Sequence, residues 1–280
     1  MDKVLLGIDI GGTNLKVGRI ENGIIVKNNF SIVDTKATKE ETLSSLFSVI
    51  DSVFDENIEA IGIGVPAVVD PLTGIVYDVQ NIPSWKEVAL KEIIKKRYNL
   101  PVTINNDANC FALGEKIFGK GKNYENFVGL SIGTGIGMGI IINNHLYNGV
   151  LCGAGEVGML PYKEGIMEDY SSSHFFKNNY NESAKLMNQR ATEGDKIALK
   201  SFAEFGQHLG ECIKAILYTY APEAIIIGGS ISHSYSFFKP EMELSLKSFA
   251  YQKQIENLKI EVSNHEGIAI LGAASLCVNR

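Results

Sequence analysis

The stretch "GIDIGGTNLKVGRI", residues 7–20, places one acidic residue and a glycine pair between two apolar runs. Asp9 interrupts the first run, and Gly11, Gly12 and Thr13 follow before the alternation of apolar and polar residues resumes. Glycines in such a turn let backbone N–H groups approach a phosphate without a Cβ atom in the way. The stretch therefore predicts a strand, a glycine turn and a second strand, and for one such turn alone an ordinary hairpin is favoured over a phosphate-binding turn.

The same pattern returns at residue 126 as "NFVGLSIGTGIGMGIIINNHLYNG". Aligned on the glycine turns, residues 9–13 lie over residues 131–135, and Leu6 lies over Val128. Internal duplication of this kind indicates two similar lobes. Two repeated turns facing a shared cleft could hold a triphosphate from both sides, so the duplication favours phosphate binding over the ordinary hairpin.

The composition excludes several classes of protein. The chain has 280 residues, 45% of them hydrophobic, and a formal net charge of -6, which argues against a nucleic-acid partner. It has no apolar run near the roughly 20 residues of a membrane span and no signal-peptide pattern at its start, so we expect no membrane partner. A cytoplasmic protein with reduced thiols is predicted, since no C-x-x-C pair occurs among Cys110, Cys152, Cys212 and Cys277.

Periodicity predicts an α/β fold. Thr38 and Glu41 form a capping box before a helix, and strands and helices then alternate. Strands are expected at 3–10, 14–20, 24–31, 59–66, 101–107, 223–232 and 258–264. Helices are expected at 85–99, 108–121 and 195–220, and in the stretch 267–278, which is rich in small residues.

Five motifs together resemble the ROK family of sugar kinases, within the actin-like and hexokinase-like ATPase superfamily. They are "DIGGT" (9–13), "NNDANCFALGE" (105–115), "GTGIGMGI" (133–140), "GAGEVG" (153–158) and "IIIGGSIS" (225–232). The resemblance covers nearly the whole chain and is glucokinase-like. It implies two RNase-H-like lobes around a central cleft. The N-terminal lobe would comprise residues 1–115 plus a C-terminal helix at about 266–280, and the C-terminal lobe residues 116–265.

The resemblance also implies ATP as a cofactor. By similarity, Gly11, Gly12 and Thr13 form the first phosphate turn, Gly133, Thr134 and Gly135 form the second, and Gly228 and Gly229 lie at the adenosine. Asp9 would face the phosphates at a strand end. A carboxylate there is repelled unless a cation intervenes, so we expect Asp9 to hold Mg²⁺, through water.

Four polar residues are candidates for the substrate site. Asp107 reads locally as a helix N-cap, whereas the resemblance implies a catalytic base, with Asn106 on a neighbouring sugar hydroxyl. Glu156, in a glycine-rich loop, and Glu168 would accept sugar hydroxyls by the same resemblance. Their alternatives are a solvated loop acid for Glu156 and a first-turn helix acid for Glu168.

The chain departs from the family pattern after "GEVG". Most members carry a histidine there and three cysteines shortly afterwards, whereas this chain has Met159 followed by "LPYKEGIMEDY". A thioether cannot replace a zinc-binding imidazole, so we expect no zinc site. The family histidine also touches the sugar, so its absence alters part of the ring contact. His174 is nearby, but a single helical histidine is usually only partly exposed.

We therefore expect ATP-dependent phosphorylation of a hexose at its 6-hydroxyl, with glucose as the substrate. The tract "GVPAVVDPLTGIVYDVQNIPSW" (64–85) is similar to glucokinase-type members. N-acetylmannosamine is the rival, since some kinases of that sugar also have a short loop. A sugar-responsive regulator is disfavoured because only eight residues precede Asp9, and the sugar motifs argue against a chaperone-like ATPase. The oligomeric state is open, and a homodimer is compatible with the sequence.

Overall fold

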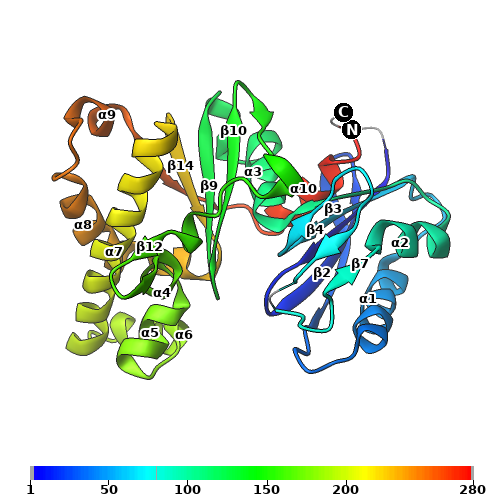
Figure 1. Cartoon of the computed structure of the whole chain (residues 1–280), viewed down its shortest axis with the longest axis horizontal. Coiled ribbons are helices and arrows are strands. Elements are labelled where there is room, and N and C mark those ends of the chain that lie inside the picture. The colour runs from blue at the N-terminus through cyan, green and yellow to red at the C-terminus, as the bar shows by residue number, and fades with distance from the viewer. Residues whose placement is uncertain (1–2, 80, 279–280) are drawn as a thin grey trace. The chain divides into compact units, whose positions relative to one another are not determined.

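The computed structural model describes residues 3–79 and 81–278, and its contacts divide the chain into two compact units (Figure 1). Unit 1 comprises Met1–Glu125, Gly139–Ala154 and Asn264–Arg280, and unit 2 comprises Asn126–Met138 and Gly155–Ser263. The lobe bounds implied by the resemblance differ from these units at residues 116–125, 139–154 and 264–265, and they stay a prediction.

Among its described residues, unit 1 contains a main sheet, a small sheet and four α-helices. Its elements are β1 (Leu5–Ile10), β2 (Asn14–Glu21), β3 (Ile24–Ile32), α1 (Lys39–Val53), β4 (Ala60–Val65), β5 (Val68–Val69), β6 (Val76–Tyr77), β7 (Glu87–Val88), α2 (Leu90–Tyr98), β8 (Val102–Asn106), α3 (Asp107–Ile117), η1 (Lys120–Asn123), β11 (His145–Leu146), η2 (Val150–Cys152) and α10 (Ile268–Ser275).

Unit 2 is largely helical, and β10 (Ile136–Ile142) begins in it and ends in unit 1. Its other elements are β9 (Phe127–Ile132), η3 (Val157–Met159), β12 (Pro161–Tyr162), β13 (Gly165–Ile166), α4 (Met167–Ser171), α5 (Ser173–Tyr180), α6 (Ala184–Thr192), α7 (Lys196–Tyr220), β14 (Ala224–Gly228), η4 (Ser230–Ser234), α8 (Tyr235–Leu246), α9 (Gln252–Asn257) and β15 (Lys259–Val262). Among the helices that the structure describes, none combines the length and the apolar character that crossing a membrane would need.

The main sheet of unit 1 has the strand order β3-β2-β1-β4-β8, and β1, β4 and β8 run parallel. Alternate residues of a strand face opposite sides of a sheet, which explains the two cores. Leu6 and Ile8 pack in the cluster that contains α1 and α2, whereas Leu5 packs in the cluster that contains Leu271 of α10. Each face of the sheet is therefore covered by helices.

The second sheet repeats this order as β11-β10-β9-β14-β15. Its register matches as well, because Leu6 lies opposite Ile61 on β4 while Val128 lies opposite Ile225 on β14. In both cases the paired strands are parallel. The predicted duplication and the α/β fold class are therefore confirmed.

The three largest differences from the predicted element boundaries are of four or five residues. The helix expected at 85–99 begins only at Leu90, because Val88 pairs with Val76 in the small sheet. The strand expected at 223–232 ends at Gly228, since the next residue has φ +81° and starts a 3₁₀ turn. Helix α3 ends at Ile117, four residues early. The capping box of Thr38 and Glu41 is confirmed at the start of α1.

Helix α10 packs against the sheet of unit 1 at two glycine positions. A Cβ atom added to Gly7 would collide with the carbonyl oxygen of Ile270, and one added to Gly62 would collide with that of Ala273. Backbone carbonyls cannot move aside as a flexible side-chain end can. These strand glycines therefore allow the backbone of α10 to lie directly on β1 and β4.

We expect Gly62→Ala to destabilise the protein by about 1–3 kcal/mol, because overpacking a close contact forces backbone shifts. Urea unfolding measures the change. Gly133→Ala is the matched control, since the nearest atom to its added Cβ is Ser230 Oγ at 3.6 Å, an ordinary contact. Equal midpoints for Gly62→Ala and wild type would show that α10 does not depend on this close approach.

Candidate functional site

The first group of predicted site residues lies at the carboxyl ends of parallel strands in unit 1. Asp9 is on β1 opposite Gly64 on β4, and Asn106 ends β8 opposite Val65. Gly64 therefore lies between Asp9 and Asp107. It pairs with Asp9, and a Cβ atom added to it would lie 3.3 Å from the Cα of Asp107. The open edge formed by parallel strand ends is where ligands bind in α/β sheets. Asp9, Asn106 and Asp107 are therefore brought together in unit 1.

Asn106, not Asp107, caps helix α3. The Asn106 side-chain oxygen accepts hydrogen bonds from the backbone N–H groups of Ala108 at 2.8 Å and Asn109 at 3.3 Å. The reading of Asp107 as the N-cap is thus wrong, because its neighbour already fills that role. Asp107 is the first helical residue, where the helix dipole stabilises negative charge.

Asn105 was not singled out from the sequence, yet it organises this helix start. Its side-chain oxygen accepts from the Asn106 backbone N–H at 2.8 Å and from Asn109 Nδ2 at 2.9 Å. Its own amide nitrogen donates to Asn148 Oδ1 at 2.9 Å. The run of asparagines around Asp107 was the available signal. This buried network fixes the backbone that carries Asp107.

The first glycine turn is closed by a hydrogen bond from the Gly11 N–H to the Asn14 carbonyl oxygen at 2.8 Å. Asn81 covers Gly12, because a Cβ added there would lie 2.7 Å from Asn81 Nδ2. The Thr13 carbonyl accepts from the Val33 N–H at 2.9 Å. Asn81 was overlooked as a site residue, although it begins the "NIPSW" ending of the tract discussed above.

Asp9 is a buried carboxylate whose charged form is disfavoured by its surroundings. Desolvation raises its pKa, and the positive charge of Lys16 opposes that rise. Ionised Asp9 would gain from a positive charge at the turn. Mg²⁺ is commonly held by one or two carboxylates together with substrate phosphates. Asp9 beside the first glycine turn fits this pattern.

The second glycine turn lies in unit 2 with the other predicted nucleotide residues. The Gly133 N–H donates to the Gly135 carbonyl at 2.9 Å. Gly228 on β14 lies opposite Ser131 on β9, and Gly229 follows with φ +81°, its backbone against Ile132. The ends of β9 and β14 thus bring residues 133–135 and the glycine pair close together in unit 2.

Glu168 contacts this turn directly. Its Oε2 atom accepts from the Ile136 backbone N–H at 2.9 Å, and a Cβ atom on Gly135 would collide with its carboxylate. Its Oε1 atom lies 4.0 Å from Nδ1 of His174, which is partly exposed as expected. Sequence reasoning missed the contact with the turn. Glu168 therefore joins the turn to the segment predicted to bind sugar.

Glu156 lies near Glu168 in unit 2. Partial desolvation raises the pKa of Glu156, and the negative charge of Glu168 raises it further, although its outer atoms remain exposed. Two carboxylates with adjacent charges favour a partner that donates several hydrogen bonds, such as a polyol. Met159 follows Glu156 closely, its side chain half exposed and its backbone N–H 3.1 Å from the Glu156 carbonyl oxygen. The expected lack of zinc stays a prediction.

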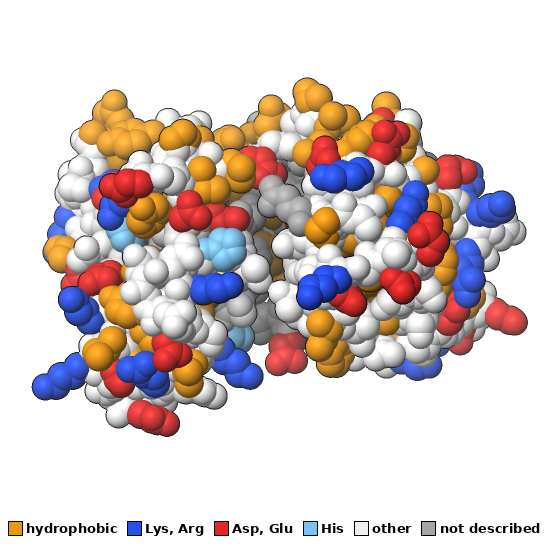
Figure 2. Space-filling view, turned by 60° about the horizontal axis from the view of Figure 1, so that its bottom comes forward, with side chains coloured by type: hydrophobic (Ala, Val, Ile, Leu, Met, Phe, Trp, Pro, Cys, Tyr) orange, Lys and Arg blue, Asp and Glu red, His pale blue; other side chains and the backbone are white. Residues whose placement is uncertain are grey.

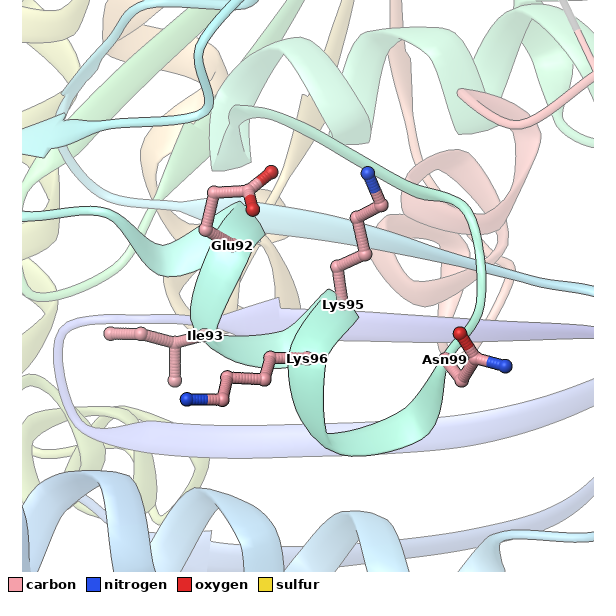
Figure 3. A pocket seen from close by; sticks show the side chains of 5 residues that line it. All are labelled: Glu92, Ile93, Lys95, Lys96 and Asn99. Carbon is pink, nitrogen blue, oxygen red and sulfur yellow. The ribbon is translucent and has the colours of Figure 1, made fainter.

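The surface adds two observations. Positive and negative side chains are interspersed over the face shown in Figure 2. A depression of about 510 Å³ lies beside α2, between Glu92, Lys96 and Asn99 (Figure 3). None of the predicted site residues lines that depression.

Comparisons with known proteins agree on one family. The model of the ROK family matches residues 5–280. The chain is 30% identical to a glucokinase of Thermotoga maritima, over 99% of this chain and 98% of that protein. It is also 31% identical to the xylose repressor of Bacillus subtilis, over 98% of this chain and 77% of the repressor.

The similar solved structures include two kinases. A ROK family glucokinase of Streptomyces griseus, in complex with glucose and AMPPNP, shares 25% identity with a TM-score of 0.85 and 98% coverage of both chains. A proposed N-acetylmannosamine kinase of Listeria monocytogenes shares 26% identity with a TM-score of 0.84 and the same coverage. The first structure supports the actin-like ATPase fold for this chain.

The pKa of Glu156 gives a direct test of the acidic pair. We expect Glu168→Gln to lower that pKa, because the substitution removes a neighbouring negative charge and keeps the side-chain shape. Carbon-13 NMR of the Glu156 carboxyl measures its titration. Glu241→Gln, which removes an exposed carboxylate bonded to Gln207, should leave it unchanged. An unaltered Glu156 titration in Glu168→Gln would show that the charge of Glu168 does not act on the Glu156 carboxyl.

Proposed function

Because the chain belongs to the ROK family, we propose that it is an ATP-dependent kinase that phosphorylates the 6-hydroxyl of a hexose, with glucose as the substrate. The observation that carries this proposal is the placement of Asp107. It is a non-capping carboxylate at a helix N-terminus, fixed by an asparagine network and separated from Asp9 by the side-chain-free Gly64. The glucokinase relatives support the reaction class.

In this mechanism Asp107 is the general base. Phosphoryl transfer has a loose transition state, so an enzyme mainly positions the groups and stabilises charge. Ionised Asp107 would accept a hydrogen bond from the sugar 6-hydroxyl, orient it in line with the γ-phosphorus and take its proton late in the reaction. Asn106 caps the helix, while Asp107 Oδ1 also accepts a hydrogen bond from the Ala108 backbone N–H at 2.9 Å, which helps to fix the carboxylate at the start of α3.

The two glycine turns would bind the nucleotide. Residues 11–13 and 133–135 would offer backbone N–H groups to its phosphates, and Gly228 and Gly229 would lie at the adenosine. Magnesium, when bound with ATP, would neutralise charge on the β- and γ-phosphates. Asp9 would hold it, through water, and its desolvated carboxylate supports that role.

The sugar ring would be held by Asn106, Glu156 and Glu168. The side-chain oxygen of Asn106 is committed to the helix cap, so its amide group, now 3.5 Å from the Ala67 carbonyl, is the part left to donate to a hydroxyl. Glu156 and Glu168 would accept hydrogen bonds from sugar hydroxyls, which would offset the repulsion between their charges. Charged acceptors make the stronger hydrogen bonds.

A regulator that binds sugar without turnover is the alternative of another class. The similarity to the xylose repressor, about as high as that to the glucokinase, keeps this alternative in view. The two functions differ in one simple respect, since only the kinase releases ADP when a hexose is added. The intact Asp107 arrangement favours the kinase.

We expect Asp107→Asn to lower kcat by about 10²- to 10⁴-fold, the range for loss of a general base, while hexose binding changes little. A coupled ADP-release assay measures kcat, and calorimetry measures sugar binding. Asp51→Asn, which alters a surface carboxylate paired with Arg97, is the matched control and should retain wild-type turnover. Near-normal kcat in Asp107→Asn would contradict the assigned base, and hexose-independent or absent ADP release by wild type would contradict the kinase.

The choice of glucose over N-acetylmannosamine rests on the tract 64–85, in which the structure adds the contact of Asn81 with the first glycine turn. The two sugars differ at C2, where one has an equatorial hydroxyl and the other an axial acetamido group. A carboxylate placed to accept the glucose 2-hydroxyl would be poorly paired with the bulkier amide. An unpaired acceptor in such a site costs about 1–3 kcal/mol.

We expect kcat/KM for glucose to exceed that for N-acetylmannosamine by at least about tenfold, which corresponds to about 1.4 kcal/mol in the transition state. Steady-state assays with both sugars at saturating ATP decide the matter. A tenfold preference for N-acetylmannosamine would overturn the choice of glucose and leave the kinase proposal intact.

A further inference from the structure

Three aromatic side chains from separate elements surround the imidazole of His208 on α7. The ring centroids of Tyr162 on β12, Tyr170 on α4 and Phe175 on α5 lie 5.8, 5.2 and 5.5 Å from that of His208. The Tyr162 hydroxyl is also 3.1 Å from His208 Nδ1. His208 is therefore the common contact of a hairpin and two short helices.

The environment keeps this contact uncharged. Burial, together with the positive charge of Lys163 on the hairpin, lowers the pKa of His208 to about 4, against the opposing charges of Glu204 and Glu211 on α7. Burial likewise raises the pKa of Tyr162 to about 12. At neutral pH a neutral imidazole therefore meets a neutral phenol, and a hydrogen bond between them carries no ionic cost.

Glu168 lies on the segment that this contact holds. In the hairpin Tyr162 pairs with Gly165, and α4 then begins with the Ile166 N–H donating to Asp169 Oδ2 at 3.0 Å. Helix α4 has only five residues, which is too short to be stable alone. Its orientation must come from tertiary contacts, and Tyr170 supplies one by returning to His208.

We propose that the contact between Tyr162 and His208 is a positioning device for Glu168. It fixes the hairpin and α4 on α7, and it thereby sets where the Glu168 carboxylate meets Ile136 N–H of the second glycine turn. His208 and Tyr162 are positioning residues, since they act through Glu168. The kinetic consequence of this inference rests on the proposed kinase function, whereas its structural consequence does not.

Tyr162→Phe and His208→Phe test the proposal, because each removes the hydrogen bond and keeps a ring in place. We expect both to lower the pKa of Glu156, as Glu168→Gln should, since the Glu168 charge moves away. The KM for the hexose should rise about three- to tenfold, the effect of one weakened hydrogen bond, while kcat stays within twofold. The double variant should be no worse than either single variant, because all three lose the same bond.

Tyr180→Phe is the matched control. It removes a hydrogen bond of 2.6 Å from a tyrosine hydroxyl to Glu204 on the same helix α7, without touching the segment that carries Glu168. It should leave the Glu156 titration and the hexose KM unchanged. An unaltered Glu156 pKa in Tyr162→Phe would overturn the inference, whatever the activity. A lowered pKa in a protein that phosphorylates no hexose would support the inference and refute the proposed function.

Discussion

The pairing of parallel strands in a fixed register is the constraint on which this molecule depends. Asp9 lies opposite Gly64 in the first sheet, and Ser131 lies opposite Gly228 in the second. Parallel strands end at the same edge, so whatever follows them in sequence is gathered there. The glycine turns and the start of α3 come directly after such strands. A change of register by one residue would send these side chains to the other face.

Charge is the second organising feature, because the candidate residues are mostly acids that lack full compensation from the protein. Asp9 is desolvated and faces one lysine charge, and Glu156 and Glu168 repel each other. Compact domains rarely keep such groups without a use. In the proposed function, the acids of unit 1 would serve a cation and a hydroxyl proton, and those of unit 2 would accept hydrogen bonds from hydroxyl groups.

The fold was predictable from the sequence because its signals are local and repeated. Glycine turns, alternation and the capping box of Thr38 each lie within a few residues. For the candidate site, the sequence indicated residue types but not their contacts. Which of two adjacent acceptors, Asn106 or Asp107, caps α3 depends on backbone angles. The contact of Tyr162 with His208 joins positions 46 residues apart in a hairpin that no periodicity marks.

The position of α10 has a consequence for the order of folding. This helix, Ile268–Ser275, covers one face of a sheet whose strands lie within the first 106 residues. At a synthesis rate of about 5–20 residues per second, many seconds pass between the synthesis of these strands and that of α10. Unit 2 is complete in sequence before then. Strands β1, β2 and β3 therefore leave the ribosome well before α10, and the sheet face that α10 covers is exposed to mispairing and to chaperones until that helix follows.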